Sequence, residues 1–185
     1  MKNSPNHWLE EPQQKLRRKN QILFSKESPL LQELSFLVAK EDRRALVLWA
    51  LELAQEDAEN LHGKYPQEER PLQTIAAARL WASGQIKMPE AKRAILACHT
   101  LARELTSPED IALCHAVGQG CSVVHTPGHA LGLPLYELTA IVRRAGLENC
   151  RQPVEYRAER YVERLLYWHA HWWEFPGEWA AFLCR

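Results

Sequence analysis

Regularly spaced apolar residues, interrupted by proline and glycine, are the feature that most constrains how this chain can fold. From Pro29 onward, apolar side chains recur three or four positions apart, which is the spacing of one face of an α-helix. The interruptions fall at Gly63, Gly84, Pro108 and Gly146, residue types that end or begin helices. No stretch of useful length alternates between apolar and polar residues as a strand would. The pattern predicts an all-α protein.

The interruptions divide the chain into a series of expected helices joined by short loops. Short loops favour antiparallel neighbours, and the many alanine and glycine residues on the helix faces allow close helix approach. We therefore expect a compact bundle of about six to seven mostly antiparallel helices. The expected helices cover about 30–38, 41–62, 68–83, 89–105, 108–125, 127–145 and 154–175.

The length of 185 residues is typical of a single domain with one hydrophobic core. Residues 1–28 are rich in Asn, Gln, Lys and Pro and are predicted to be a polar N-terminal extension. Residues 29–185 are predicted to form one helical domain, and its C-terminal segment is rich in aromatic residues.

Charge and cysteine content exclude several classes of protein. The 23 basic residues balance the 23 acidic ones, whereas nucleic-acid-binding proteins usually carry a basic excess, so no nucleic-acid partner is expected. No apolar run approaches the ~18 residues of a membrane span, and the first twenty residues lack the apolar core of a signal peptide. Five cysteines form no disulfide framework. These features predict a cytoplasmic protein with reduced thiols and no membrane association.

The central part of the chain carries a family resemblance. Its most specific pieces are the run Trp81–Ala91 followed by His99, and the pattern His125-x-x-x-His129. These pieces resemble the all-helical immunity proteins of bacterial toxin systems, specifically the family numbered five among them. The resemblance implies a small protein that neutralises a cognate protein toxin by binding it, and it implies no catalytic residues. The stretches that carry it are AKEDRRALVLWALELAQ (39–55), 65–105 and 116–146.

A cluster of histidine and cysteine residues gives an alternative prediction of a metal site. If one helix continued past residue 122, Cys121, His125 and His129 would lie one turn apart, and Cys98 or His99 could complete four zinc ligands. The proline between the two histidines disturbs this register, and the spacing matches no standard zinc finger. We therefore expect no metal and no cofactor. A metal-binding protein or an enzyme that uses this cluster stays open as an alternative.

The triplet Asp42-Arg43-Arg44 begins the second long predicted helix and is a candidate partner-binding site. Arginine guanidinium groups bind carboxylates and phosphates through two parallel hydrogen bonds. The simpler interpretation is a set of surface ion pairs, each contributing ~0–1 kcal/mol.

Aromatic residues crowd into the C-terminal segment, where Trp168, Trp172 and Trp173 are candidate contacts for a partner. One helix cannot direct all of them to the same side. Some are expected to cover the bundle, and others to contact a toxin or a second copy of the chain. The sequence thus favours a non-enzymatic toxin-binding protein, with a metal-dependent protein and a structural homodimer as alternatives.

Overall fold

The computed structural model describes residues 7–184, and within this range it contains α-helices and short 3-10 helices but no strand. The predicted all-α class is therefore confirmed. The α-helices are α1 (Glu10–Arg17), α2 (Gln32–Val38), α3 (Arg43–Lys64), α4 (Arg70–Ala82), α5 (Met88–Glu104), α6 (Pro108–Ser122), α7 (Gly132–Ala145) and α8 (Arg151–His171).

The predicted count of six to seven helices is wrong, because the part of the chain from residue 7 to residue 184 holds eight. The additional helix is α1, which lies in the segment predicted to be an extension. Its sequence, EEPQQKLR, lacks the apolar spacing that marks the other helices. It has two acids in its first turn and two bases in its last, an arrangement that the helix dipole favours.

Residues 8–28 contribute side chains to the core although the segment is polar overall. Trp8, Leu23 and Phe24 are buried, and the rings of Trp8 and Phe24 pack with centroids 6.0 Å apart. The Leu23 backbone N–H donates to the Thr139 hydroxyl on α7 at 2.9 Å. Three apolar side chains therefore hold this segment on the helical body.

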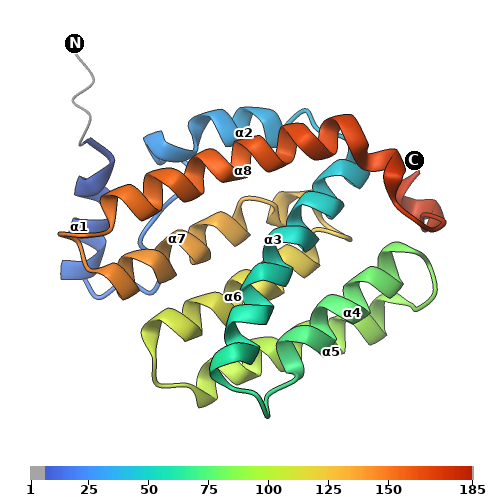
Figure 1. The fold of residues 1–185 in the computed structure, drawn as a ribbon, viewed down its shortest axis with the longest axis horizontal. Coiled ribbons are helices and arrows are strands. Elements are labelled where there is room, and N and C mark those ends of the chain that lie inside the picture. Colours follow the sequence, from blue (N-terminus) through green and yellow to red (C-terminus); the bar gives the residue numbers. More distant parts are fainter. Residues whose placement is uncertain (1–6, 185) are drawn as a thin grey trace.

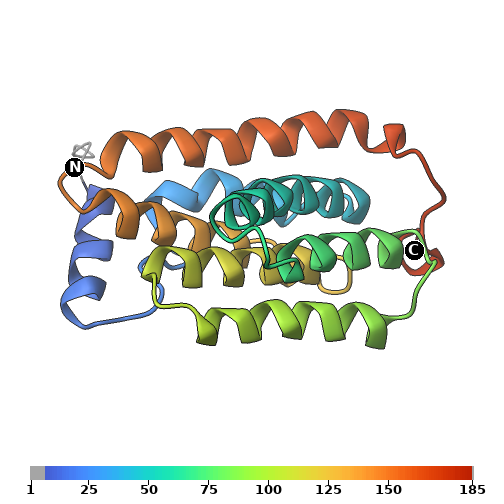
Figure 2. The same cartoon turned by 60° about the horizontal axis from the view of Figure 1, so that its bottom comes forward.

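Helices α3 and α6 lie at the centre of the molecule. Helix α6 contacts α3, α4, α5 and α7, while α3 also contacts α8. Figure 2 shows α8 and α5 along opposite edges with the remaining long helices between them, and Figure 1 shows α4 and α5 side by side at the end near the C-terminus.

A glycine permits the close packing of these two central helices. A Cβ atom at Gly120 of α6 would lie 2.8 Å from the Ala54 Cβ and 3.1 Å from the Ala50 carbonyl oxygen of α3. Real side chains avoid such short contacts, so any larger residue here would push the helices apart. The expectation that small residues mark close helix contact is correct at this crossing.

Four of the cysteines, Cys98, Cys114, Cys121 and Cys150, are buried as free thiols, and Cys184 is exposed. Among the helices of residues 7–184, none combines the length and apolar character needed to cross a bilayer.

Candidate partner-binding groove

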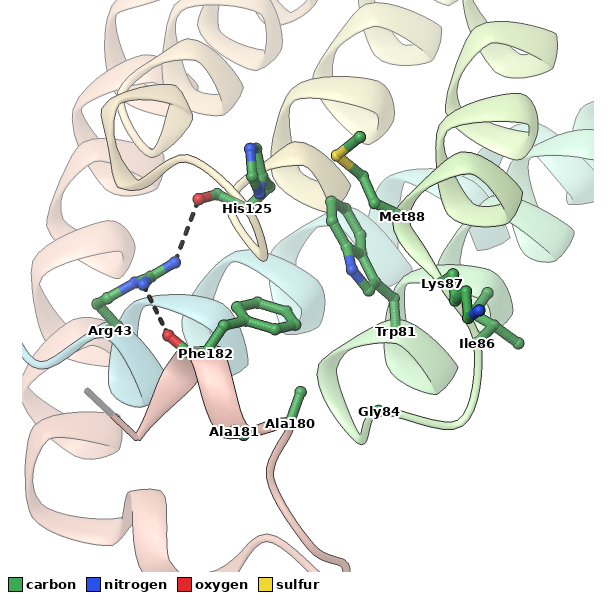
Figure 3. Close-up of a pocket in the computed structure, with 10 residues that line it drawn as sticks. All are labelled: Arg43, Trp81, Gly84, Ile86, Lys87, Met88, His125, Ala180, Ala181 and Phe182. Carbon is green, nitrogen blue, oxygen red and sulfur yellow. Dashed lines mark hydrogen bonds between the residues drawn. The ribbon is translucent and has the colours of Figure 1, made fainter.

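Two adjoining hollows of about 640 and 460 Å³ lie on the surface. They share Trp81, Met88 and His125, so they form one continuous feature, which we call the Trp81–His125 groove. Figure 3 shows the first hollow, with Trp81 between Met88 and Phe182. The groove brings together residues from both sequence pieces that carry the family resemblance.

The first hollow is shaped by the turn between α4 and α5. Gly84 follows the end of α4 with a φ of 74°, a left-handed conformation that favours glycine. The chain then enters α5, where the Glu90 carboxylate accepts a hydrogen bond from the Lys87 backbone N–H at 3.1 Å. This cap fixes the first turn of α5 and places the exposed Lys87 and Met88 at the rim of the hollow.

Arg43, at the start of α3, connects three separate segments beneath this hollow. Its guanidinium donates to the Phe182 carbonyl at 2.9 Å and to the His125 carbonyl at 3.1 Å, as Figure 3 shows. The other two members of the predicted triplet pair with each other. The Asp42 carboxylate caps α3 through the Arg44 backbone N–H and accepts two hydrogen bonds from the Arg44 side chain, which lower the pKa of Asp42. Of the triplet, only Arg43 lines the groove.

The C-terminal tail forms one wall of the first hollow. The Ala180 backbone N–H donates to the Ala82 carbonyl at 2.8 Å, which attaches the tail to the end of α4. The Phe182 ring then packs on Trp81 with centroids 6.2 Å apart. Sequence reasoning identified the aromatic tail but not this position.

The second hollow contains three of the five histidine and cysteine residues that were named as candidate metal ligands. His99, His125 and His129 line it, together with the exposed Lys92 and Leu96. The His125 ring stacks on Trp81 at a centroid distance of 5.7 Å. The His129 Nδ1 donates to the Gln119 amide oxygen at 2.8 Å, since an amide oxygen can only accept.

His99 is held by a second histidine that sequence reasoning did not select. Its Nδ1 lies 2.9 Å from the Nδ1 of His115, so one ring donates a hydrogen bond to the other. Burial and the neighbouring His115 lower the pKa of His99 to about 4. The ring is therefore neutral at physiological pH.

The candidate Cys98 is buried in the core and does not line the groove, and the same holds for Cys121. Burial raises the pKa of the Cys121 thiol, which disfavours the thiolate that zinc requires. The reason lies in the helix boundary: α6 ends at Ser122 instead of reaching residue 125, and Pro127–His129 form a 3-10 turn before α7 begins at Gly132. Within the described part of the chain, no group of three His, Cys, Asp or Glu residues is placed to hold a metal ion.

The charges around the groove are of one sign. Arg43, Lys87 and Lys92 line it, and no Asp or Glu among the residues that the structure describes lines either hollow. The remaining lining is aromatic, aliphatic or neutral polar. Such a surface complements a partner segment that presents carboxylates beside apolar side chains.

A comparison with protein-family models gives a match over residues 37–164 to the family described as "Imm-5 like putative immunity protein". The chain belongs to this family. No curated protein and no solved structure matches the chain. The matched range includes every residue of the groove except the tail wall at 180–182.

The predicted aromatic contacts of this Imm-5 like chain lie beyond the matched range and differ in exposure. The Trp168 indole N–H donates to Glu52 on α3. The Arg44 guanidinium carbon lies over Trp172, 3.7 Å from the ring centroid. Trp173 is 62% exposed. Helix α8 begins at Arg151, earlier than predicted, because Pro153 is tolerated in a first helical turn. It also ends earlier, at His171, where a 3-10 turn over Trp172–Glu174 follows.

Two buried carboxylates were missed by sequence reasoning although the sequence carries a signal for them. Asp57 lies midway between Leu53 and Leu61 on the apolar stripe of α3, and Glu137 lies midway between Leu133 and Ile141 on α7. A carboxylate four residues from apolar neighbours on both sides faces the interior of the bundle.

Proposed function

We propose that this chain is an immunity protein that binds and neutralises a bacterial protein toxin, and that the Trp81–His125 groove is its toxin-binding surface. The single observation that carries the proposal is convergence. Segments that are far apart in sequence, α3, the α4–α5 turn and the α6–α7 connection, meet at one groove inside the range that matches the family.

The groove supports a partner of defined chemistry. Met88 is 42% exposed and Leu96 is 52% exposed, so both present apolar surface at the groove. Basic side chains stand at the rim, where they accelerate association with an acidic surface and help to select it. We infer that the toxin inserts an acidic segment with at least one apolar side chain.

The proposed mechanism is steric and electrostatic, without a chemical step. The immunity protein covers a surface of the toxin that its activity requires. We place this interaction in the cytoplasm, where free thiols such as those of this chain persist.

A growth assay tests the function. Bacteria carrying an inducible toxin encoded next to this chain's gene would be tested with and without the immunity protein. We expect the wild-type chain to restore growth, and the double variant Lys87→Glu/Lys92→Glu to fail although it accumulates to the same level. Lys26→Glu, an exposed site in the segment between α1 and α2, is the matched control and should protect. If cells that express the toxin grow unimpaired without the immunity protein, the neutralising function is contradicted. Full protection by the double variant would contradict the assignment of the groove as the toxin-binding surface.

Exposed Trp173 favours a second candidate, the structural homodimer. Its ring stacks on His171 at 5.7 Å but leaves most of its surface available. A dimeric mass by light scattering at micromolar concentration that becomes monomeric in Trp173→Ala would support this candidate. A monomeric mass for both proteins would count against it.

A further inference from the structure

A second cavity lies where α3, α6, α7 and α8 meet, away from the groove. It has a volume of about 280 Å³, and we call it the Asp57 pocket. Four carboxylates line it, together with two arginines: Glu56 and Asp57 from α3, Glu109 from α6, Glu137 and Arg144 from α7, and Arg157 from α8.

Most of these charges already have partners. Arg157 contacts Glu56 at 2.7 Å and Glu137 at 2.5 Å, and the Tyr161 hydroxyl donates to Glu137 at 2.8 Å. Glu109 pairs with Lys64 at 3.1 Å. The two arginines and Lys64 therefore compensate Glu56, Glu137 and Glu109.

Asp57 is the exception. Its side chain lines the pocket, the residue is only 5% exposed, and its Oδ2 finds no hydrogen-bond partner within residues 7–184. Burial, and after it the charge of Glu137, raise the pKa of Asp57 well above its ordinary value. A buried carboxylate oxygen without a donor is unfavourable, and a donor brought by a ligand would remove that cost.

The rest of the lining suits the stem of an organic cation. Tyr156 is 63% exposed at the pocket, and Pro153 and Ile141 add apolar surface. A tyrosine ring attracts a cation through its face, and the apolar residues can contact a carbon chain. A bare metal ion fits poorly, since no three carboxylates of the described chain converge on one point.

We propose that the Asp57 pocket binds an alkylammonium or alkylguanidinium group, with the cationic head on Asp57 and the carbon stem along Tyr156. Such a group occurs both on free polyamines and on lysine or arginine side chains of a protein. The proposal is independent of the groove and of the toxin-binding function.

Binding should be coupled to pH. A bound cation favours the ionised form of Asp57. At a pH where Asp57 is protonated in the empty pocket, cation binding therefore releases that proton. Affinity should therefore rise as the pH increases from 5 to 8. The charged and titratable groups that face Asp57 are Glu56 on α3, Cys114 on α6, Glu137 on α7, and Arg157 and Tyr161 on α8.

The test is a titration of the full-length protein with three probes, followed by NMR of the Asp and Glu side-chain carboxyl groups. Butylguanidine represents a free alkylguanidinium, Nα-acetyl-arginine amide, which carries the same single charge, represents a protein side chain, and N-butylurea is a neutral molecule of similar shape. We expect saturable shifts of the Asp57 carboxyl carbon with one or both cations and none with N-butylurea. The cation that binds more tightly identifies the source.

Variants make the test specific. Asp57→Asn should weaken cation binding at least tenfold, and Tyr156→Ala, at a site that is 63% exposed, should weaken it several-fold. Glu163→Gln, an exposed carboxylate elsewhere on α8, should change nothing. Absence of saturable shifts, equal binding of N-butylurea, or unchanged affinity in Tyr156→Ala and Asp57→Asn would overturn the proposal.

Discussion

The Trp81–His125 groove and the Asp57 pocket differ in the sign and the burial of their charges. Within the described residues, bases but no carboxylates line the groove, whereas four carboxylates and two arginines line the pocket. The net charge of the chain is nonetheless zero. The comparison shows that balanced composition can conceal regions of opposite character, each suited to a different partner.

The consequences of the charges also differ. The lysines of the groove are exposed, so they affect association and selectivity more than folding. Asp57 and Glu137 are buried, so their charges affect the stability of the helical bundle directly. Changes at the pocket should therefore alter unfolding, while changes at the groove rim should alter binding and leave unfolding nearly unchanged.

Removal of Arg157 should have the largest effect. Arg157→Met would leave Glu56 and Glu137 without their shared counter-charge, and a broken buried ion pair costs about 3–5 kcal/mol. Urea unfolding at pH 8 measures this loss, which should shrink at pH 5 because the buried Glu137 carboxyl, whose pKa is raised, becomes protonated. Arg160→Met, which removes an exposed i,i+3 pair on the same helix, is the control and should cost less than about 1 kcal/mol. Equal losses of unfolding free energy in the two variants would contradict the prediction that the buried ion pair stabilises the fold more than the exposed one.

A methyl group placed behind the groove should have an intermediate effect. A Cβ at Gly118 of α6 would overlap the His99 ring and displace it from His115. We expect Gly118→Ala to lower the free energy of unfolding by about 1–2 kcal/mol and to shift the NMR signals of the His99 ring. Gly63→Ala, where no atom lies within 4 Å of the added Cβ, should be neutral or stabilising by up to about 1 kcal/mol. An undisturbed His99 signal in Gly118→Ala would contradict this packing.

Asp57→Asn should change stability by an amount that depends on pH. Because the pKa of Asp57 is raised in the folded protein, wild-type stability falls as the pH rises above the ordinary value of 3.8. Asparagine does not titrate, so the variant should gain stability relative to the wild type as the pH rises to 8, and its Tm should then exceed that of the wild type. Near pH 4 the two should coincide. Thermal unfolding of both proteins from pH 4 to pH 8 measures this difference. A variant less stable than the wild type at pH 8 would contradict the prediction.

Local structure could be predicted well from the sequence, because apolar spacing and capping residues act over a few positions. Helix α4 was expected at 68–83 and is found at 70–82, and α5 was expected at 89–105 and is found at 88–104. Helix α1 was missed because six of its eight residues are polar, and its position depends on the burial of Trp8, Leu23 and Phe24 nearby.

The site was harder to predict because it depends on contacts between distant segments. The sequence selected Arg43, His99, His125 and His129 individually, and the structure places all four in one groove. It could not show that the tail closes the groove through Phe182, 139 residues from Arg43. The carboxylate at Asp57, by contrast, was predictable in principle from its place on the apolar stripe of α3.

Titration calorimetry with the purified toxin tests the toxin-binding role of the groove most directly. Leu96→Ala and Leu166→Ala remove apolar side chains of nearly equal exposure, 52% and 51%, one in the groove and one on α8. If the groove binds the toxin, Leu96→Ala combined with Lys92→Glu should raise Kd at least tenfold. Leu166→Ala combined with Lys26→Glu should leave Kd unchanged. The opposite pattern, with affinity lost only in the α8 variant, would contradict the assignment of the groove as the toxin-binding surface.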